Sequence, residues 1–312
     1  MEKAIKKKIS WHLVVRQRYL LLLSLPAILF TLVFSYAPLT GIYMAFTEFR
    51  PSRNGYWYDL FNAPFVGLEW FRFFFQNDFG VVMRNTLGMS LLTWIISFPA
   101  PILIAIFVNE VRSNRIKKGV QTISYLPYFI SWVIASNMVL TLLSSGGAVN
   151  EVLQTLGITD SPIIFLQEGQ YFWWIIAFLN TWKDMGYNAI IFLAAIAGIS
   201  QEQYEAAEID GARRWQKALH ITIPSIRPVI VIMMILSVGG ILSNGFEQII
   251  LLQNPSLFSV SDVLDTYVFR FGIQGGMWSF STAVGLFRSV VTFTLVMLAN
   301  QISRKVSDTA LF

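Results

Sequence analysis

Residues 180–188, NTWKDMGYN, place polar side chains inside a long apolar run. The candidates for chemistry in this run are Asn180, Trp182, Lys183, Asp184, Tyr187 and Asn188. A spacing of i, i+4 and i+7 puts Asn180, Asp184 and Tyr187 on one face of a helix, and Lys183 adjoins that face. Amides and carboxylates bond hydroxyl groups, and aromatic rings pack on apolar ring faces. The set therefore suits a polar solute that carries both hydroxyl groups and apolar faces.

Other polar and aromatic residues lie in further apolar runs. They are Trp132, Asn137, Asn244, Phe246, Glu247, Gln248 and Arg288. Polar groups at membrane depth are costly and mostly face a cavity or a partner helix, so these residues are also candidates for a substrate path. Hydrogen bonds between helices explain them equally well. The cations Lys183 and Arg288 could meet a carboxylated substrate, or they could neutralise Asp184 and Glu247.

Membrane-spanning helices are the elements that must position these residues. The chain has 312 residues, of which 55% are hydrophobic and 13% charged, whereas soluble domains carry about 25% charged residues. A spanning helix needs about 20 apolar residues. The sequence predicts an all-α polytopic membrane protein with six transmembrane helices, at 19–46, 86–108, 123–143, 171–199, 229–252 and 282–301.

The residue inventory argues against several kinds of site. The chain has no cysteine, which excludes disulfides and thiolate ligands. Its two histidines, His12 and His220, lie far apart in the sequence. No metal site and no catalytic residue is predicted.

The distribution of basic residues predicts the orientation. Six Lys or Arg lie in residues 1–18, four each in 109–122 and 201–228, and two in 302–312, whereas the three intervening loops share five. Positive residues favour the cytoplasmic side, so both tails, 1–18 and 302–312, are expected in the cytoplasm. This topology accounts for the net charge of +5 without a nucleic-acid partner. Residues 19–301 are expected to form one membrane domain, with long outer loops that form ordered surfaces.

The basic start followed by an apolar run resembles a signal peptide. The run is too long, however, and no small-residue cleavage site follows it. The first segment is therefore predicted to be a retained helix.

Residues 205–228, EAAEIDGARRWQKALHITIPSIRP, form a charged stretch between two apolar runs. Gln201 to Ile209 favours a short helix, which Asp210 and Gly211 are expected to end. Asp210 is expected to cap a second short helix. Two prolines, Pro224 and Pro228, are then expected to end the excursion and to restart the chain as a membrane helix.

The second short helix has an apolar stripe of Trp215, Ala218 and Leu219. The basic residues Arg213, Arg214 and Lys217 lie off this stripe. One interpretation is an amphipathic helix that lies on the lipid interface. Three glutamates at a spacing of three, Glu202, Glu205 and Glu208, are poor lipid partners and favour a groove on a protein instead.

The same stretch resembles the EAA loop of binding-protein-dependent ABC importer permeases. The shared features are Glu205-Ala206-Ala207, Gly211 four positions later, Ile221 and Pro224, while Ile223 replaces the leucine that is usual in the family. Segments such as LPAILFTLVFSYAPLTGIYMAF, QTISYLPYFISWV and GFEQIILLQNP extend the resemblance over nearly the whole chain. They resemble permeases for oligosaccharides and polysaccharide fragments, and in particular those that import acidic glycans such as alginate or pectin oligosaccharides.

The resemblance implies a type I ABC importer permease fold in which residues 201–224 form coupling helices. The residues that it assigns to ATPase coupling are Glu205, Ala206, Ala207, Asp210, Gly211, Trp215 and Pro224. It implies a dimer of ATPase subunits that carries ATP and Mg, a second permease that is a paralogue rather than a copy, and an extracellular or periplasmic solute-binding protein. The chain itself has no GxxxxGK[ST] loop, so it is expected to bind no cofactor and to hydrolyse no ATP. The expected location is the bacterial cytoplasmic membrane.

Three alternatives stay open. An ion-coupled secondary transporter needs a deep carboxylate, for which Asp184 is the candidate, but it leaves the charged loop unexplained. A membrane enzyme needs a cluster of acid–base or metal-binding residues, which the sequence does not offer. A permease for another small solute would share all of these sequence features and differ only in the substrate that it carries.

Overall fold

The computed structural model describes residues 17–243 and 245–307, apart from the side chains of 305–307. In chain order, with η for 3₁₀ and π turns, its elements are α2 Arg18–Thr31, η1 Leu32–Tyr36, η2 Ala37–Phe46, α3 Tyr56–Asn62, α4 Glu69–Gln76, α5 Phe79–Ser97, α6 Pro99–Glu110, α7 Asn114–Tyr125, η3 Leu126–Phe129, α8 Trp132–Leu142, α9 Ala148–Thr155, α10 Gly169–Ala197, α11 Gln201–Ile209, α12 Arg214–Lys217, η4 Ala218–Thr222, α13 Ile223–Val238, α14 Phe246–Leu252, η5 Pro255–Leu257, α15 Phe258–Ser261, α16 Leu264–Val268, η6 Phe269–Gln274 and α17 Trp278–Ser307. Among the described residues, β pairing is limited to a bridge between Thr47 and Phe65. The chain is mostly helical, as predicted.

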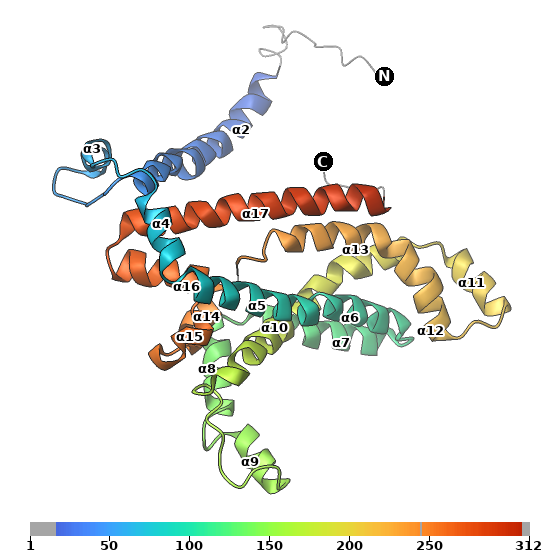
Figure 1. Ribbon diagram of the computed structural model, residues 1–312. Helices are drawn as coiled ribbons and strands as arrows, with labels where there is room; N and C mark the ends of the chain where they lie inside the picture. The colour runs from blue at the N-terminus through green and yellow to red at the C-terminus, as the bar shows by residue number, and fades with distance from the viewer. Residues whose placement is uncertain (1–16, 244, 308–312) are drawn as a thin grey trace.

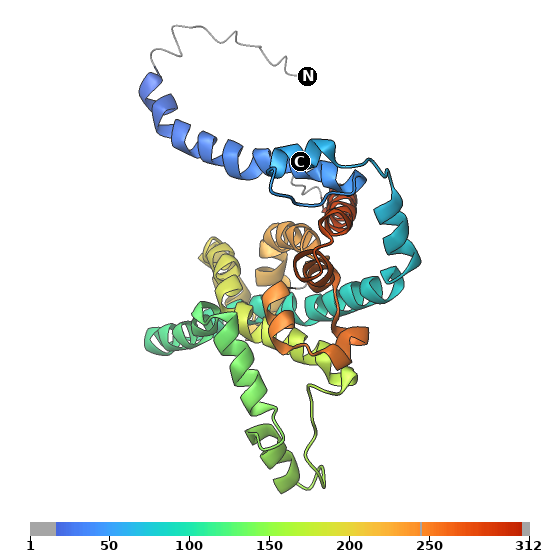
Figure 2. The same ribbon diagram turned by 90° about the vertical axis from the view of Figure 1, so that its left-hand side faces the viewer.

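The first predicted span is one continuous helix, Arg18–Phe46, made of α2, η1 and η2. Its most apolar window is 0% buried within the chain, and both views show α2 standing away from the other helices (Figures 1 and 2). At its far end, η2 packs on the body, mainly against α17. The exposed apolar surface of α2 suits a lipid environment or another membrane chain.

Helix α10 forms the centre of the bundle and packs against α5 and α6. Its Ala189, Phe192 and Ile196 join Ala105 and Ile226 in one buried apolar cluster. Towards its other end, α10 joins a second apolar cluster that includes residues of α8 and α14. Side chains on several faces of α10 therefore contact different neighbours, which makes α10 the common wall of the fold.

Four helices of the described chain are long and apolar enough to cross a membrane, and a bent pair brings the number to five. The four are Arg18–Phe46, Phe79–Glu110, Arg214–Val238 and Trp278–Arg304. The fourth predicted span, 171–199, corresponds to α10, which has 29 residues and at 1.5 Å per residue is about 43 Å long. Its length exceeds the roughly 30 Å of a bilayer core. The polar residues 180–188 lower its hydropathy, so it is not among the four helices that are apolar enough to count as spans. A multi-pass helical protein is thus established, and the count of six remains a prediction.

The third predicted span, 123–143, is not one straight helix. The segment Asn114–Phe129 and helix α8 meet at 99° across a break of two residues. Pro127 occupies the second position of η3, and the serine at 131 caps α8 by accepting a hydrogen bond from the Ile134 amide at 3.3 Å. A helix end and a new helix start are thus both encoded at the bend.

The prediction that Pro224 and Pro228 restart the chain is wrong. Residues Arg214–Val238 form a continuous helix that contains both prolines. The π turn Ala218–Thr222 directly precedes this part of the helix. Its wider winding gives room to the ring of Pro224, which would press on the carbonyl four residues earlier in a regular α-helix.

The fifth predicted span, 229–252, is broken. Helix α13 ends at Val238, and α14 begins only at Phe246. Glycines 239 and 240 follow α13, and Gly245 has a φ of 77°, which favours glycine. The last predicted span, 282–301, is longer than expected, since α17 runs from Trp278 to Ser307 and continues into the predicted C-terminal tail.

The predicted ordered outer loops contain short helices, including α3, α4, α15 and α16. Phe74, Tyr267 and Phe280 are buried together, with ring centroids 5.8–6.3 Å apart. The Tyr267 hydroxyl donates to the Asp78 carboxylate at 2.9 Å. Burial, and then the hydrogen bond to Asp78, raise the pKa of the Tyr267 phenol. Figure 1 shows α3 and α4 at the end of the molecule opposite to α11 and α12.

Candidate functional site

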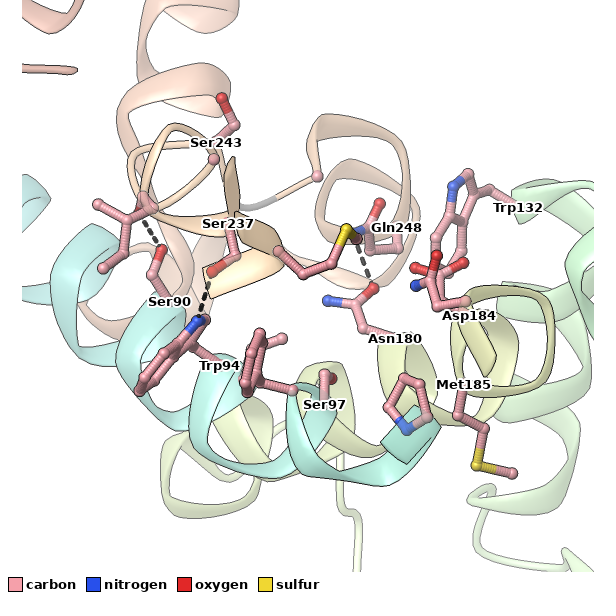
Figure 3. A pocket seen from close by; sticks show the side chains of 18 of the residues that line it. Ser90, Trp94, Ser97, Trp132, Asn180, Asp184, Met185, Ser237, Ser243 and Gln248 are labelled. Carbon is pink, nitrogen blue, oxygen red and sulfur yellow. Dashed lines mark hydrogen bonds between the residues drawn. The ribbon is translucent and has the colours of Figure 1, made fainter. Parts of the chain in front are cut away.

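A cavity of about 450 Å³, lined by both polar and apolar side chains, lies between the long helices (Figure 3). Its walls come from α5, α6, α8, α10, α13, α14 and the break between the last two. The lining residues are Ser90, Thr93, Trp94, Ser97, Phe98, Pro101, Trp132, Asn180, Asp184, Met185, Asn188, Phe192, Met233, Ser237, Gly240, Ile241, Ser243, Gly245 and Gln248. The break after Val238 therefore forms part of the cavity wall, through Gly240, Ser243 and Gly245.

Helix α10 supplies two amide groups and a carboxylate of the cavity. Asn180, Asp184 and Asn188 line it together, at a spacing of four residues that keeps them on one face. Gln248 of α14 donates from Nε2 to the Asn180 Oδ1 at 2.9 Å, and Trp132 of α8 lies beside Asp184 (Figure 3). The structure thus brings together these five of the residues predicted for the substrate path.

Helix α5 supplies a hydroxyl and indole wall that the sequence analysis missed. Trp94 donates from Nε1 to the Ser237 hydroxyl at 2.8 Å, and the Ser90 hydroxyl donates to the Ile241 carbonyl (Figure 3). The Ser97 hydroxyl lies 2.5 Å from that of Thr181. Ser90, Trp94 and Ser97 recur at helical spacing inside an apolar span, and this periodicity of hydrogen-bonding side chains was the available signal.

Lys183 does not line the cavity. Its residue is 6% exposed, and its Nζ donates to the carbonyl oxygens of Pro127 at 3.3 Å, Tyr128 at 2.8 Å and Ile130. Lys183 is next to Asp184 in the sequence, as predicted, but its side chain lies against the bend between α7 and α8 and not in the cavity. The structure therefore directs this ammonium group to backbone carbonyls.

Arg288 pairs with Asp265 of α16 and donates to the Ser243 hydroxyl. Of the partners considered for Arg288 in the sequence, the structure provides neither Asp184 nor Glu247 but Asp265. Glu247 is exposed and Phe246 packs on Phe269, with ring centroids 5.0 Å apart. Through Ser243, the Arg288 guanidinium contacts the cavity wall from behind.

The other predicted path residues lie apart from the cavity. Tyr187 stacks on Tyr128, with centroids 3.9 Å apart and ring planes 6° from parallel. Trp182 lines an apolar groove between α8 and α10, and Asn137 is exposed on α8. Asn244 lies outside the described residues.

The charged loop forms two helices joined by a tight turn, as predicted. Gly211 has a φ of 77°, and no atom lies within 4 Å of where its Cβ would be, so backbone conformation rather than crowding explains the glycine. Asp210 ends α11 and does not cap α12. Instead, the Arg213 amide at the start of α12 donates to the Gln216 side chain at 2.7 Å.

A few contacts hold this loop against the body. The Tyr204 and Thr222 hydroxyls lie 2.8 Å apart, and Arg214 lies 3.8 Å from the Glu110 carboxylate at the end of α6. Across the turn, Lys217 bonds to the Glu208 carboxylate at 2.5 Å. This hydrogen bond, and then the lysine charge, lower the pKa of Glu208.

Most of the predicted coupling residues face outward. Glu205, Ala206, Asp210, Gly211, Trp215 and Pro224 are exposed, and Ala207 is half-buried. Trp215 of α12 is 60% exposed, and Ile209 at the end of α11 is 87% exposed. The predicted apolar stripe of α12 does not form one surface. Ala218 is buried against residues of α13 and α6, whereas Trp215 and Leu219 face outward.

Comparison with known proteins places this geometry in context. Residues 97–308 match the family described as "Binding-protein-dependent transport system inner membrane component". Two relatives come from Bacillus subtilis (strain 168). Protein LplB is 40% identical over 309 residues, covering 98% of this chain and 95% of the relative. The polygalacturonan/rhamnogalacturonan transport system permease protein YteP is 38% identical over 312 residues, covering 99% and 95%.

A solved structure is similar over nearly the whole chain. It is the crystal structure of a bacterial alginate ABC transporter in complex with an alginate pentasaccharide-bound periplasmic protein. The matching chain has a TM-score of 0.88 and 38% identity, covering 97% of this chain and 100% of that one.

Proposed function

We propose, for a chain that belongs to the family of binding-protein-dependent transport system inner membrane components, that the cavity between α5, α8 and α10 is the path of an oligosaccharide. The chain is a multi-pass permease subunit of an ABC importer, in which ATP hydrolysis belongs to a separate subunit. The cavity is the observation that carries the proposal. It combines two indole rings, Trp94 and Trp132, with amide, hydroxyl and carboxylate groups.

This combination of groups matches the surfaces of a sugar. Hydroxyl groups of the sugar would bond Asn180, Asn188 and Asp184, and its apolar ring faces would pack on the indoles. The volume of about 450 Å³ lies in the range of small-ligand pockets, about 300–1,000 Å³. YteP is named for transport of pectin-type polysaccharides, and the solved neighbour belongs to an alginate transporter, which favours fragments of acidic glycans as the substrate class.

The remaining parts of the transporter follow from the same proposal. A solute-binding protein would deliver the sugar to the outer helices, and the periplasmic protein in the alginate transporter complex supports this partner. A second permease, a paralogue, would complete the pathway. Both termini would lie in the cytoplasm and 19–301 would form the membrane domain, with the tails at 1–18 and 302–312.

The loop 201–224 would dock on an ATPase dimer that binds ATP and Mg. Glu205 would make polar contacts at the docking cleft, with Ala206 and Ala207 allowing close approach. Asp210 and Gly211 would form the turn, and Trp215 would provide an exposed apolar anchor. Pro224 would mark the end of the loop within the continuous helix Arg214–Val238.

The test is the ATPase activity of the complete transporter in vesicles, with its binding protein, against oligomers of alginate, galacturonate and neutral arabinose. Stimulation by one or more oligomers is the expected result. Stimulation by uronates alone would assign the acidic substrate class, and stimulation by the neutral oligomer alone would remove it. No stimulation by any oligomer would contradict transport of these sugars.

A further inference from the structure

Helix α10 and the bend between α7 and α8 approach each other unusually closely. A Cβ at Gly186 would lie 1.9 Å from the Ser124 carbonyl oxygen, so only glycine permits this contact. One residue further on, the Tyr187 ring stacks on Tyr128 of η3. The bend is thus packed directly on the middle of α10.

Lys183 lies one turn away on the same helix and bonds to the bend itself. Its three acceptors, the carbonyls of Pro127, Tyr128 and Ile130, surround the point where η3 ends and α8 has yet to begin. The Pro127 carbonyl also accepts from the Ile130 amide at 3.1 Å. Carbonyls at the end of a helix can accept further hydrogen bonds, and a buried ammonium group needs them, so the bend and Lys183 satisfy each other. The ammonium also lies 5.0 Å from the centre of the Trp132 ring and 5.7 Å from that of Tyr128.

These contacts join the bend to a residue of the cavity wall. Trp132 is the first residue of α8, and the cavity contains its side chain and that of Asp184, the neighbour of Lys183 in sequence. Lys183 therefore acts on the orientation of the Trp132 ring in two ways. It bonds to the bend that precedes Trp132, and its ammonium group lies against the ring itself.

We propose that Lys183 is a positioning residue, which holds the 99° bend on α10 and thereby fixes the Trp132 ring as a platform for substrate. The inference rests on the proposed passage of an oligosaccharide through the cavity. It assigns Lys183 to the backbone and to Trp132 rather than to a sugar carboxylate.

Uptake by the complete transporter in vesicles tests the proposal, with the oligomer that stimulates the wild-type ATPase most. Lys183→Met is expected to raise the half-saturation concentration of loaded binding protein about tenfold, or about 1.4 kcal/mol, with a smaller change in maximal rate. Lys183→Gln keeps two N–H donors and should recover part of the loss. Lys118→Met, at an exposed lysine of α7, is the matched control and should leave the constant unchanged.

A double-mutant cycle separates positioning from general destabilisation. In a Trp132→Ala background, Lys183→Met should change the half-saturation concentration less than twofold, because the platform is already absent. An equal effect in both backgrounds would overturn the proposal. So would an unchanged constant for Lys183→Met, or loss of the assembled complex in both Lys183 variants, which would assign Lys183 to folding.

A second measurement does not depend on transport. The chain has no native cysteine, so Tyr128→Cys with Tyr187→Cys introduces a single pair across the contact. A short bifunctional thiol reagent should link the pair when Lys183 is present and lose most of this yield in Lys183→Met. Undiminished linking would overturn the holding role, whereas absent uptake by the wild-type transporter would contradict only the proposed function.

Discussion

The cavity and the loop 201–224 are both polar regions of an apolar chain, but their polar groups are used differently. In and behind the cavity, they bond to the chain itself, as Gln248 does to Asn180, Trp94 to Ser237 and Lys183 to the bend. On the loop, Glu205, Ile209 and Trp215 face outward. The cavity wall is thus fixed by internal contacts, whereas the loop presents a surface for another molecule. The two regions should respond differently to substitution.

Gly186→Val should give the largest effect, on the cavity side of the comparison. Its side chain would collide with the Ser124 carbonyl, which is backbone that cannot move aside, and overpacking of this kind costs about 3 kcal/mol. Thermal unfolding in detergent should show a clearly lower midpoint. Gly285→Ala, where no atom lies within 4 Å of the added Cβ, is the control. An unchanged midpoint for Gly186→Val would contradict the close packing of the bend on α10.

Glu205→Lys should act on the loop without affecting folding. Glu205 is exposed on α11, so its reversal should leave the unfolding midpoint unchanged, while a like-charge contact at the docking cleft costs binding energy. We expect sugar-stimulated ATPase activity and uptake to fall about tenfold. Glu202→Lys, also exposed on α11, controls for the charge change alone. Wild-type uptake by Glu205→Lys would remove this residue from coupling.

Asp184→Asn should change selectivity more than stability, since Asp184 is half-buried and lines the cavity. Its carboxylate repels a uronate, so the substitution should improve the half-saturation ratio of galacturonate to arabinose oligomers about fivefold, or about 1 kcal/mol. Uptake competition between the two oligomers measures this ratio. If the ratio does not move, the side chain is not facing the sugar.

The pair Glu208–Lys217 should give the smallest effect. Because Lys217 lowers the pKa of Glu208 below its ordinary 4.5, the pair stabilises the turn above that pH and loses this contribution as the pH falls through the lower, folded value. Hydrogen exchange of α11 amides, corrected for the intrinsic rate, should rise in that acidic range. In Glu208→Gln this rise should be absent, and an identical rise in the variant would exclude the pair as its cause.

The sequence alone identified the helical membrane class, the two-helix loop with Gly211 at its turn, and the family resemblance. These features depend on local properties. Apolar run length predicts a helix in the bilayer, and a positive φ requires glycine at one position. Helical periodicity also predicted correctly that Asn180 and Asp184 share a face.

Only the tertiary structure decided which partners the polar residues have. Periodicity says which side chains share a face, but not which neighbour that face meets, so Asn188 rather than Tyr187 joined the cavity. The partners of Lys183 are backbone carbonyls exposed by a bend, and no side-chain pattern encodes them. Arg288 likewise found Asp265, which is distant in sequence and brought near by the packing of α16 on α17. Local physics determined the elements, and the contacts between them determined the site.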